Sequence, residues 1–173
     1  MKKLCYVLPR FDPNSPTHLV HLHEILQRIN GQVDLLLVYG SSTDVTPDID
    51  AHFVKISAGF RPIKAFRYLA ALTTAYIMGY RSFYVHYHTL SSLWASLLCR
   101  IFGGRTYVFC CVKNELYFTP WRLRYRELRR KILIDLPVRL SYRWAQRVVT
   151  CSDYMRSHIL ENHPIQHDRV KVL

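Results

Sequence analysis

Short apolar runs alternate with helix-like segments along nearly the whole chain, and this alternation constrains the fold more than any other feature. The runs have the length of strands and are apolar throughout, which is typical of strands that have helices on both faces. They lie at residues 3–9, 33–40, 52–57, 82–88, 106–112, 147–152 and 170–173. Apolar residues at helical spacing predict helices at residues 17–30, 62–79, 90–102 and 153–162. The alternation predicts a doubly wound, mostly parallel sheet, which is a Rossmann-like α/β fold with three layers, α/β/α.

Proline, glycine and serine residues mark where the predicted helices begin and end. Pro62 opens the second helix and Gly79 ends it, because proline fits the first helical turn and glycine the residue after the last. Gly103 and Gly104 stop the third helix. Ser152 precedes the last helix and is its predicted N-cap, since a serine hydroxyl accepts a hydrogen bond from a free backbone N–H.

The chain carries a formal net charge of +12, and the excess lies in its middle. Residues 51–147 contain 17 lysines and arginines but only three acidic residues. Between Ala51 and Asn114 there is no acidic residue at all. A block of this kind is typical of a surface that faces phosphate groups, whether of lipid, nucleic acid or a nucleotide.

Residues 121–147 are the most basic part of this block, with nine basic and two acidic residues among tryptophan, tyrosine and leucine. They belong to a longer stretch, 113–146, that is partly helical in pattern and is interrupted by Pro137. Such a composition favours a helix on a membrane surface, although the same residues can bind RNA phosphates or form a solvated helix face. The residues predicted to contact a membrane or a lipid phosphate are Trp121, Arg122, Arg124, Tyr125, Arg129, Arg130 and Lys131.

No segment is predicted to cross a membrane. The apolar run at the N-terminus is broken by Pro9 after about five residues, whereas the apolar region of a secretory signal needs roughly 7–15. The longest apolar run elsewhere, residues 68–80, is shorter than the roughly 20 residues of a spanning helix. The five cysteines are odd in number and two are adjacent, so we expect reduced thiols and a cytoplasmic protein.

His86 and His88 stand two apart at the carboxyl end of the fourth predicted strand, where binding sites of such sheets lie. Three interpretations are open: two metal ligands, one buried and one rim histidine, or a pocket histidine that contacts substrate. A zinc site needs further ligands, and the absence of acidic residues nearby in the sequence disfavours it. Cys110 and Cys111 end the fifth strand, where alternation lets at most one of them reach a pocket, and we expect core residues rather than nucleophiles.

The loop after the first strand reads DPNSPT where a dinucleotide-binding protein has its glycine-rich turn, so a nicotinamide cofactor is disfavoured. Thr17 and His18 follow at the predicted start of the first helix, where free N–H groups favour an anion. A plain helix start with an ordinary N-cap explains the same residues. Asp48 and Asp50 form a D-x-D pattern that some metal-dependent sugar transferases use, but the polar loop around them favours a solvated turn.

Three stretches of the chain form a set: LCYVLPRFDPNSPTHLVHLHEIL, FYVHYHTLSSLWASLLCRIFGGRTYVF and RWAQRVVTCSDYMRSHILENHPIQHDRVKVL. The first stretch resembles the opening strand, loop and helix of one family. The second resembles the strand–helix–strand unit that carries that family's histidines, and the third resembles its closing strand and helix. That family is the retaining glycosyltransferases of family 4, which have the GT-B fold, and the likeness is to their N-terminal half. His18, His86, His88 and Ser152 stand at positions that match the family's histidines and serine. The resemblance covers nearly the whole chain.

The resemblance also implies a set of substrate-binding residues, while the catalytic residue stays unknown. The predicted set is Arg10, Asn14, Ser15, Thr17, His18, His86, His88, Cys111, Lys113, Asn114, Glu115 and Ser152. Two positions depart from the family pattern. Pro13 and Asn14 stand where many members have two glycines, and Cys111 stands where many have a histidine at the end of the fifth strand.

The resemblance implies that residues 1–173 are the N-terminal, acceptor-binding domain of a GT-B glycosyltransferase of the hexosyltransferase class. The chain stops at VKVL, before the family's turn into a C-terminal nucleotide-sugar-binding domain, so we expect that domain to be absent and the isolated chain to be inactive. The expected partners are a nucleotide-sugar donor, a lipid-linked or saccharide acceptor and an anionic membrane, with no metal or other cofactor. The protein is expected to be peripheral on the cytoplasmic face of a membrane.

Two alternatives stay open at this point. The chain is a non-catalytic subunit of a split glycosyltransferase, pairing with a separate donor-domain chain, or it is a basic Rossmann-like module that binds RNA. No aromatic RNA-stacking motif or helix-turn-helix supports the second, so nucleic acid is the less favoured partner.

Overall fold

The computed structural model of the protein describes residues 2–9, 33–41, 50–57, 60–86, 89–111 and 135–173. Its strands are β1 (Lys2–Leu8), β2 (Val33–Ser41), β3 (His52–Ser57), β4 (Ser82–His86), β5 (Arg105–Phe109), β6 (Arg147–Thr150) and β7 (Val170–Val172). Its helices are α2 (Arg61–Ile77), α3 (Thr89–Phe102), α5 (Leu136–Trp144), α6 (Asp153–Asn162) and the 3-10 turn η3 (His167–Arg169). The predicted Rossmann-like α/β fold is confirmed.

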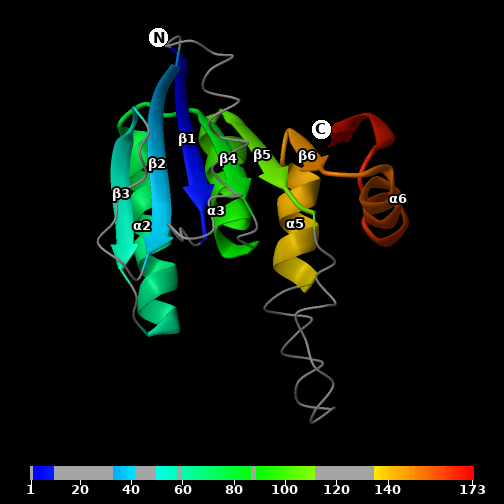
Figure 1. Cartoon of the computed structure of the whole chain (residues 1–173), viewed down its shortest axis with the longest axis horizontal. Helices are drawn as coiled ribbons and strands as arrows, with labels where there is room; N and C mark the ends of the chain where they lie inside the picture. Colours follow the sequence, from blue (N-terminus) through cyan, green and yellow to red (C-terminus); the bar gives the residue numbers. More distant parts are fainter. Residues whose placement is uncertain (1, 10–32, 42–49, 58–59, 87–88, 112–134) are drawn as a thin grey trace.

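The strands form one seven-stranded sheet in the order β3-β2-β1-β4-β5-β6-β7 (Figure 1). All six neighbouring pairs are parallel. β1 lies between β2 and β4, with Lys2 opposite Val33 on one side and Leu4 opposite Ser82 on the other. Because every strand runs in the same direction, the carboxyl ends of all seven lie at one edge of the sheet.

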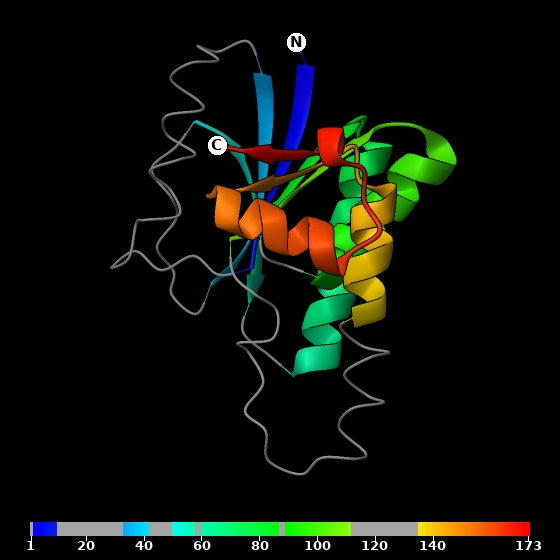
Figure 2. The same ribbon diagram turned by 90° about the vertical axis from the view of Figure 1, so that its right-hand side faces the viewer.

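Helices α2, α3 and α5 lie on the same side of the sheet (Figure 2). Helices α2 and α3 bury the residues of β1 and β4 that point toward them, such as Cys5, Val7 and Val85, and together these form the main core. The buried residues of α5 pack in a separate cluster with β5, β6 and α6. The opposite face carries a further cluster, drawn from β1 and β2, to which no described helix contributes. The helix predicted at residues 17–30 lies outside the described residues.

The residues predicted to begin or end helices have those roles in the structure. Pro62 lies in the first turn of α2. Gly79 follows that helix with φ +92°, a left-handed conformation that suits glycine because it has no Cβ. Gly103 does the same after α3, with φ +84°. At the start of α6, Ser152 Oγ accepts a hydrogen bond from the Met155 N–H over 3.3 Å and is therefore the N-cap.

Pro137 lies buried in the first turn of α5 as the structure describes that helix. Proline is tolerated there because the first-turn N–H has no partner within the helix to lose. The prediction that it interrupts a longer helix stays a prediction, because the residues before Asp135 lie outside the described part of the chain. The rest of the basic stretch, residues 112–134, lies outside the described residues.

Two strands are also shorter than predicted at their carboxyl ends. β5 ends at Phe109 and β6 at Thr150. Past the end of β5, the Cys110 N–H still donates a hydrogen bond to the Val149 carbonyl oxygen over 2.9 Å. The apolar composition of these segments therefore continues for one or two residues beyond the regular ladder, which is why it overestimates strand length.

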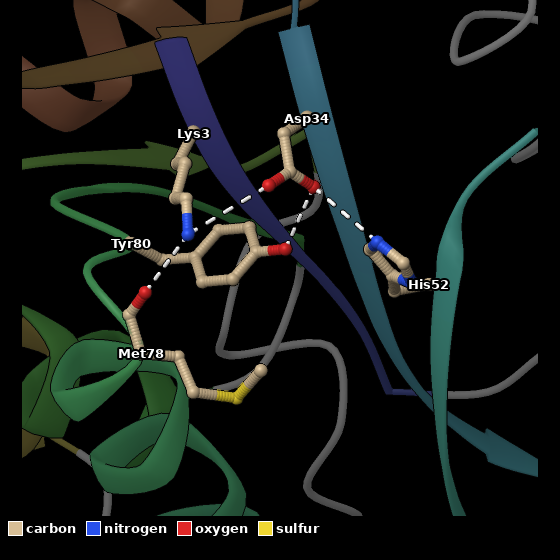
Figure 3. A network of polar contacts seen from close by, with 5 residues as sticks. All are labelled: Lys3, Asp34, His52, Met78 and Tyr80. Carbon is tan, nitrogen blue, oxygen red and sulfur yellow. Dashed lines mark hydrogen bonds and ion pairs between the residues drawn. The ribbon is translucent and has the colours of Figure 1, made fainter. Parts of the chain in front are cut away.

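At the amino edge of the sheet, Asp34 of β2 is the centre of a polar network that draws on three strands (Figure 3). Tyr80 Oη donates a hydrogen bond to Asp34 Oδ1 over 2.8 Å, and Lys3 Nζ lies 3.8 Å from Asp34 Oδ2. Lys3 Nζ also donates to the Met78 carbonyl oxygen over 3.0 Å, and His52 Nε2 lies 3.8 Å from Asp34 Oδ1. The network ties the starts of β1, β2 and β3 to the end of α2.

Removing the Tyr80 hydroxyl is expected to change how stability depends on pH. Burial, and then the hydrogen bond to Asp34, raises the pKa of Tyr80 to about 12 from its usual value of 10. Because the pKa of Tyr80 is higher in the folded protein than in the unfolded chain, the protonated hydroxyl stabilises the fold. This contribution is fully present below pH 10 and is lost as the pH rises toward 12. Tyr80→Phe should therefore lose about 1 kcal/mol at pH 7, where the hydrogen bond is missing. Its free energy of unfolding should then fall less steeply than that of the parent between pH 10 and 12.

Urea denaturation at several pH values between 7 and 12 measures both effects. Tyr154→Phe on α6 is the matched control, because that ring is largely exposed. Parallel stability curves for the parent and Tyr80→Phe above pH 10 would show that the Tyr80 hydroxyl is not the group that titrates.

Candidate functional site

The sheet order reverses beside β1, and this is where a doubly wound sheet offers a binding crevice. The chain runs from β1 outward to β2 and β3, and then returns to the other side of β1 as β4. Connections that leave two neighbouring strands in opposite directions leave a gap at their carboxyl ends. The carboxyl ends of β1 and β4 therefore mark the expected site.

His86 is the last residue of β4 and lies at this edge. Its register partner on β5 is Phe109, and the two rings stack with centroids 4.4 Å apart and planes 13° apart. On the other side of β4, the Tyr6 ring of β1 also stacks on His86, and the two ring centroids lie 6.2 Å apart. The imidazole is 3% exposed. Aromatic rings from both neighbouring strands thus fix the orientation of His86.

Two tyrosines continue this aromatic row along the same face of the sheet. Tyr6 and Tyr84 are register partners and stack with centroids 5.0 Å apart. Burial raises the pKa of both phenols, and the nearby Cys111 thiol adds to the shift of the Tyr84 pKa. Both hydroxyls are therefore neutral near pH 7, so the row around His86 contributes no negative charge.

Cys110 and Cys111 follow β5 and have different surroundings. Cys110 is buried in the core between the sheet and α5, whereas Cys111 is half-buried. The structure separates the pair as strand alternation predicts. Of the two thiols, Cys111 is the one placed where a ligand at the carboxyl edge can reach it.

Ser152 follows β6 at the same edge, and its hydroxyl already has a structural role. Its oxygen accepts from the Met155 N–H at the start of α6, as described above. A serine hydroxyl can accept one hydrogen bond and still donate another, so the cap leaves its proton available to a ligand. His86, Cys111 and Ser152 therefore come from three adjacent strands, β4, β5 and β6, whose spacing is about 4.8 Å between neighbours.

Gly40 near the end of β2 lies where backbone and side chains from β1 and α2 converge. A Cβ atom there would lie 2.5 Å from the Pro9 carbonyl oxygen, 2.7 Å from Tyr68 Oη and 3.2 Å from Lys64 Nζ. Tyr68 is fully buried, and its hydroxyl donates to the carbonyl oxygens of Leu8 over 3.0 Å and Pro9 over 3.2 Å. The exit of β1 is thereby fixed up to Pro9, the last residue described before residue 33.

Within the described ranges, no three histidine, cysteine, aspartate or glutamate side chains lie close enough together to hold a metal ion. The same part of the chain contains no helix that is both long and apolar enough to span a membrane. All five cysteines are free thiols.

A family model described as a glycosyl transferase 4-like domain matches residues 15–173. The chain belongs to the glycosyl transferase 4-like domain family. The predicted likeness to the N-terminal domain of GT-B glycosyltransferases of family 4 is thereby confirmed. No curated protein matches the chain in sequence.

Solved structures share the fold of this glycosyl transferase 4-like domain at low sequence identity. UDP-GlcNAc 2-epimerase from Neisseria meningitidis, bound to UDP-GlcNAc, is 15% identical with a TM-score of 0.63, over 99% of this chain and 45% of the epimerase. HepE from Anabaena, in complex with UDP and glucose, is 13% identical with a TM-score of 0.61, over 100% and 44%. The lipopolysaccharide outer core galactosyltransferase WaaB, in its apo form, is 8% identical with a TM-score of 0.59, over 98% and 44%. The domain spans less than half the length of each of these proteins.

The structure describes three of the substrate-binding residues predicted for this glycosyl transferase 4-like domain, namely His86, Cys111 and Ser152, and it places all three at one edge. The others lie outside the described residues, so their roles stay predictions. They are Arg10, Asn14, Ser15, Thr17, His18, His88, Lys113, Asn114 and Glu115. The predicted membrane contacts Trp121, Arg122, Arg124, Tyr125, Arg129, Arg130 and Lys131 lie outside them as well.

Sequence reasoning missed the residues that hold this edge in place. Tyr6 and Phe109 stack on His86 but are far from it in the sequence, so no local pattern joins them. Tyr68 reads as one more apolar residue of α2. Gly40 did carry a signal, because a glycine at the end of a buried strand often marks a close backbone approach.

Proposed function

We propose that this domain is the acceptor side of a retaining GT-B glycosyltransferase that moves a hexose from a nucleotide-sugar to a lipid-linked acceptor at a membrane surface. One observation carries the proposal: the family match covers residues 15–173, and in that fold His86, Cys111 and Ser152 lie along the carboxyl edge of the sheet, with His86 beside the switch point. The donor is held mainly by a second α/β domain, in agreement with the family resemblance. We propose no metal ion or other cofactor for the reaction.

The nucleotide-sugar donor has support from the proteins of similar fold. The Neisseria epimerase binds UDP-GlcNAc, and the Anabaena protein binds UDP and glucose. Each is about twice as long as the part that this chain matches, so their fold supports a shared architecture in which this domain supplies one wall of the cleft. We propose that activity requires the other wall, whether in the same polypeptide or in a partner chain.

His86 is the residue we propose to contact the acceptor. A neutral imidazole can donate one hydrogen bond and accept another, which suits a sugar hydroxyl. Its ring is held by Phe109 and Tyr6, so little side-chain freedom is lost when it binds. Cys111 and Ser152 add a weak donor and a hydroxyl proton on the two strands that follow.

The acceptor proposal is tested on the full-length protein. Membranes that contain it are incubated with a panel of radiolabelled nucleotide-sugars, and the label that becomes soluble in organic solvent is counted. We expect protein-dependent transfer from at least one donor into the lipid fraction, and membranes without the protein are the control. Label transferred only to water-soluble saccharide, or from no donor, would overturn the lipid-linked acceptor.

The basic segment is proposed to bring the domain to anionic lipid. Each lysine or arginine near an anionic leaflet contributes about 1 kcal/mol, so reversing three charges removes a large part of the attraction. The triple variant Arg129→Glu, Arg130→Glu, Lys131→Glu should float with vesicles rich in phosphatidylserine at least about 30-fold less well than the parent. Neutral vesicles are the control. A triple variant that floats as well as the parent would exclude this segment as the contact.

A further inference from the structure

Helix α2 carries apolar residues on two sides, and only one side is buried. The side that packs on the sheet presents Tyr68, Leu72, Ala75 and Tyr76. The opposite side presents four exposed residues, which we call the α2 stripe: Ile63, Phe66, Ala70 and Ile77. A surface helix ordinarily has polar residues on its outer side, so the α2 stripe needs a separate explanation.

Three members of the α2 stripe have large side chains, and the exposed Thr74 is the polar residue that lies between Ala70 and Ile77 on this side. The stripe's spacing of three, four and seven residues keeps its members on one side of a helix. Ile63 is 51% exposed, Phe66 70% and Ile77 78%. Phe60, immediately before the helix, is 74% exposed. At about 1.5 Å per residue, a helix of 17 residues is about 25 Å long, which is shorter than the roughly 30 Å hydrocarbon core of a bilayer.

The apolar surface continues at both ends of the α2 stripe. At the far end, Tyr76 Oη donates hydrogen bonds to the carbonyl oxygens of Phe102 and Gly103, which holds the last turn of α3 beside the end of α2. Ile101 and Phe102 in that turn are themselves exposed. At the near end, α2 extends past the carboxyl ends of β1, β2 and β3 (Figures 1 and 2). The stripe therefore begins at the same edge of the sheet as His86.

The charges that flank the α2 stripe have one sign. Arg67 is exposed beside its first turns, where its guanidinium donates to Ser57 Oγ over 2.8 Å. Arg81 follows the end of α2, and its guanidinium lies over the Tyr76 ring and donates to the Tyr76 carbonyl oxygen. No acidic residue occurs anywhere between Ala51 and Asn114, so α2 and α3 carry no carboxylate. A surface of exposed phenylalanine and isoleucine with only cations beside it is complementary to an anionic lipid leaflet.

We infer that the α2 stripe is a membrane-docking surface, with its apolar residues in the headgroup boundary of an anionic bilayer and Arg67 at the phosphates. The inference rests on the membrane part of the proposed function and adds a contact separate from residues 121–131. The start of α2 and His86 lie at the same end of the sheet, but the His86 ring is on the face opposite α2. Docking through the α2 stripe thus holds the domain at the membrane that contains a lipid-linked acceptor.

The test removes apolar contact while keeping charge. In the double variant Ile63→Gln, Phe66→Gln, we expect apparent affinity for phosphatidylserine-containing vesicles to fall at least tenfold, measured by flotation of the full-length protein. Tyr154→Gln is the matched control, because Tyr154 is a similarly exposed ring on α6, away from the stripe. It should bind as the parent does. All substituted residues are exposed, and thermal unfolding of each variant confirms that the fold is kept.

Three outcomes overturn the docking surface: equal vesicle binding by the double variant and the parent, an equal loss for Tyr154→Gln, or self-association of the parent that the double variant abolishes. The last would show that a second copy of the chain covers the α2 stripe. A second measurement, in detergent micelles, separates failure of the docking surface from failure of the proposed reaction. Sugar transfer to a lipid acceptor in detergent micelles should be unchanged in the double variant, whereas failure of all transfer by the parent would count against the proposed reaction instead.

Discussion

Replacing Gly40 by alanine will lower the free energy of unfolding by about 3 kcal/mol, the upper end of the cost of overpacking a filled site. The added Cβ would lie 2.5 Å from the Pro9 carbonyl oxygen and 2.7 Å from Tyr68 Oη, closer than real Cβ atoms come to other atoms. The Pro9 carbonyl belongs to the backbone at the exit of β1 and cannot move without pulling that strand. Moving the Tyr68 hydroxyl instead gives up its buried hydrogen bonds to Leu8 and Pro9.

Chemical denaturation of the parent and the variant measures this cost. Gly103→Ala is the matched control: its φ is +84°, but nothing lies within 4 Å of the added Cβ, so only the backbone conformation is penalised, by about 1 kcal/mol. A double-mutant cycle adds a sharper readout. In a Tyr68→Phe background the Tyr68 oxygen is gone, so Gly40→Ala should cost about 1 kcal/mol less than in the parent. Equal costs for Gly40→Ala and Gly103→Ala would contradict the close approach.

Replacing His86 by phenylalanine is the second large effect, and it is expected in activity rather than stability. Phenylalanine keeps a ring that can stack on Phe109 and Tyr6, so the free energy of unfolding should change by less than about 1.5 kcal/mol. The two ring nitrogens are lost, and with them the proposed hydrogen bond to the acceptor. Leaving the bound acceptor hydroxyl without its buried partner costs about 1–3 kcal/mol, so kcat/KM for transfer should fall about 10- to 100-fold.

The control for this variant is the same change at the opposite edge. His52 lies at the start of β3 and contacts Asp34, so His52→Phe alters the amino edge and leaves the site intact. Its kcat/KM should match that of the parent. Undiminished transfer by His86→Phe would remove this histidine from the acceptor site, even if the fold and family assignments stand.

Much of the fold could be predicted because the relevant forces act locally. Strands that are covered by helices must be apolar along their length, and glycine with a positive φ ends a helix wherever it stands, as Gly79 and Gly103 do. Ser152 was identified as a cap from its place before a helical pattern, and its hydrogen bond to Met155 confirms it. Strand order was not predictable in the same way, since the pairing of β1 with β4 joins residues far apart in the sequence.

In the candidate site, too, the sequence predicts what depends on local pattern and not what depends on contacts between distant residues. The topology of the fold sends the ends of β4, β5 and β6 to one edge, so His86, Cys111 and Ser152 could be grouped from the sequence. What surrounds them could not be, because the stacking of Phe109 on His86 depends on the register between strands. The α2 stripe was missed for a different reason. Both sides of that helix are apolar, and the pattern alone cannot say which side the sheet will cover.

The central place of β1 has a consequence for how the protein is made. One side of this strand pairs with β2. The other side pairs with β4, which begins only at Ser82, so this side stays unpaired until β4 has been synthesised. At about 5–20 residues per second, a ribosome needs several seconds to synthesise the intervening chain. During that time the nascent polypeptide presents an open, strongly apolar edge, Leu4–Val7, to anything in solution. Chaperone demand during translation should therefore be concentrated in the period before Val85 has emerged and fall afterwards.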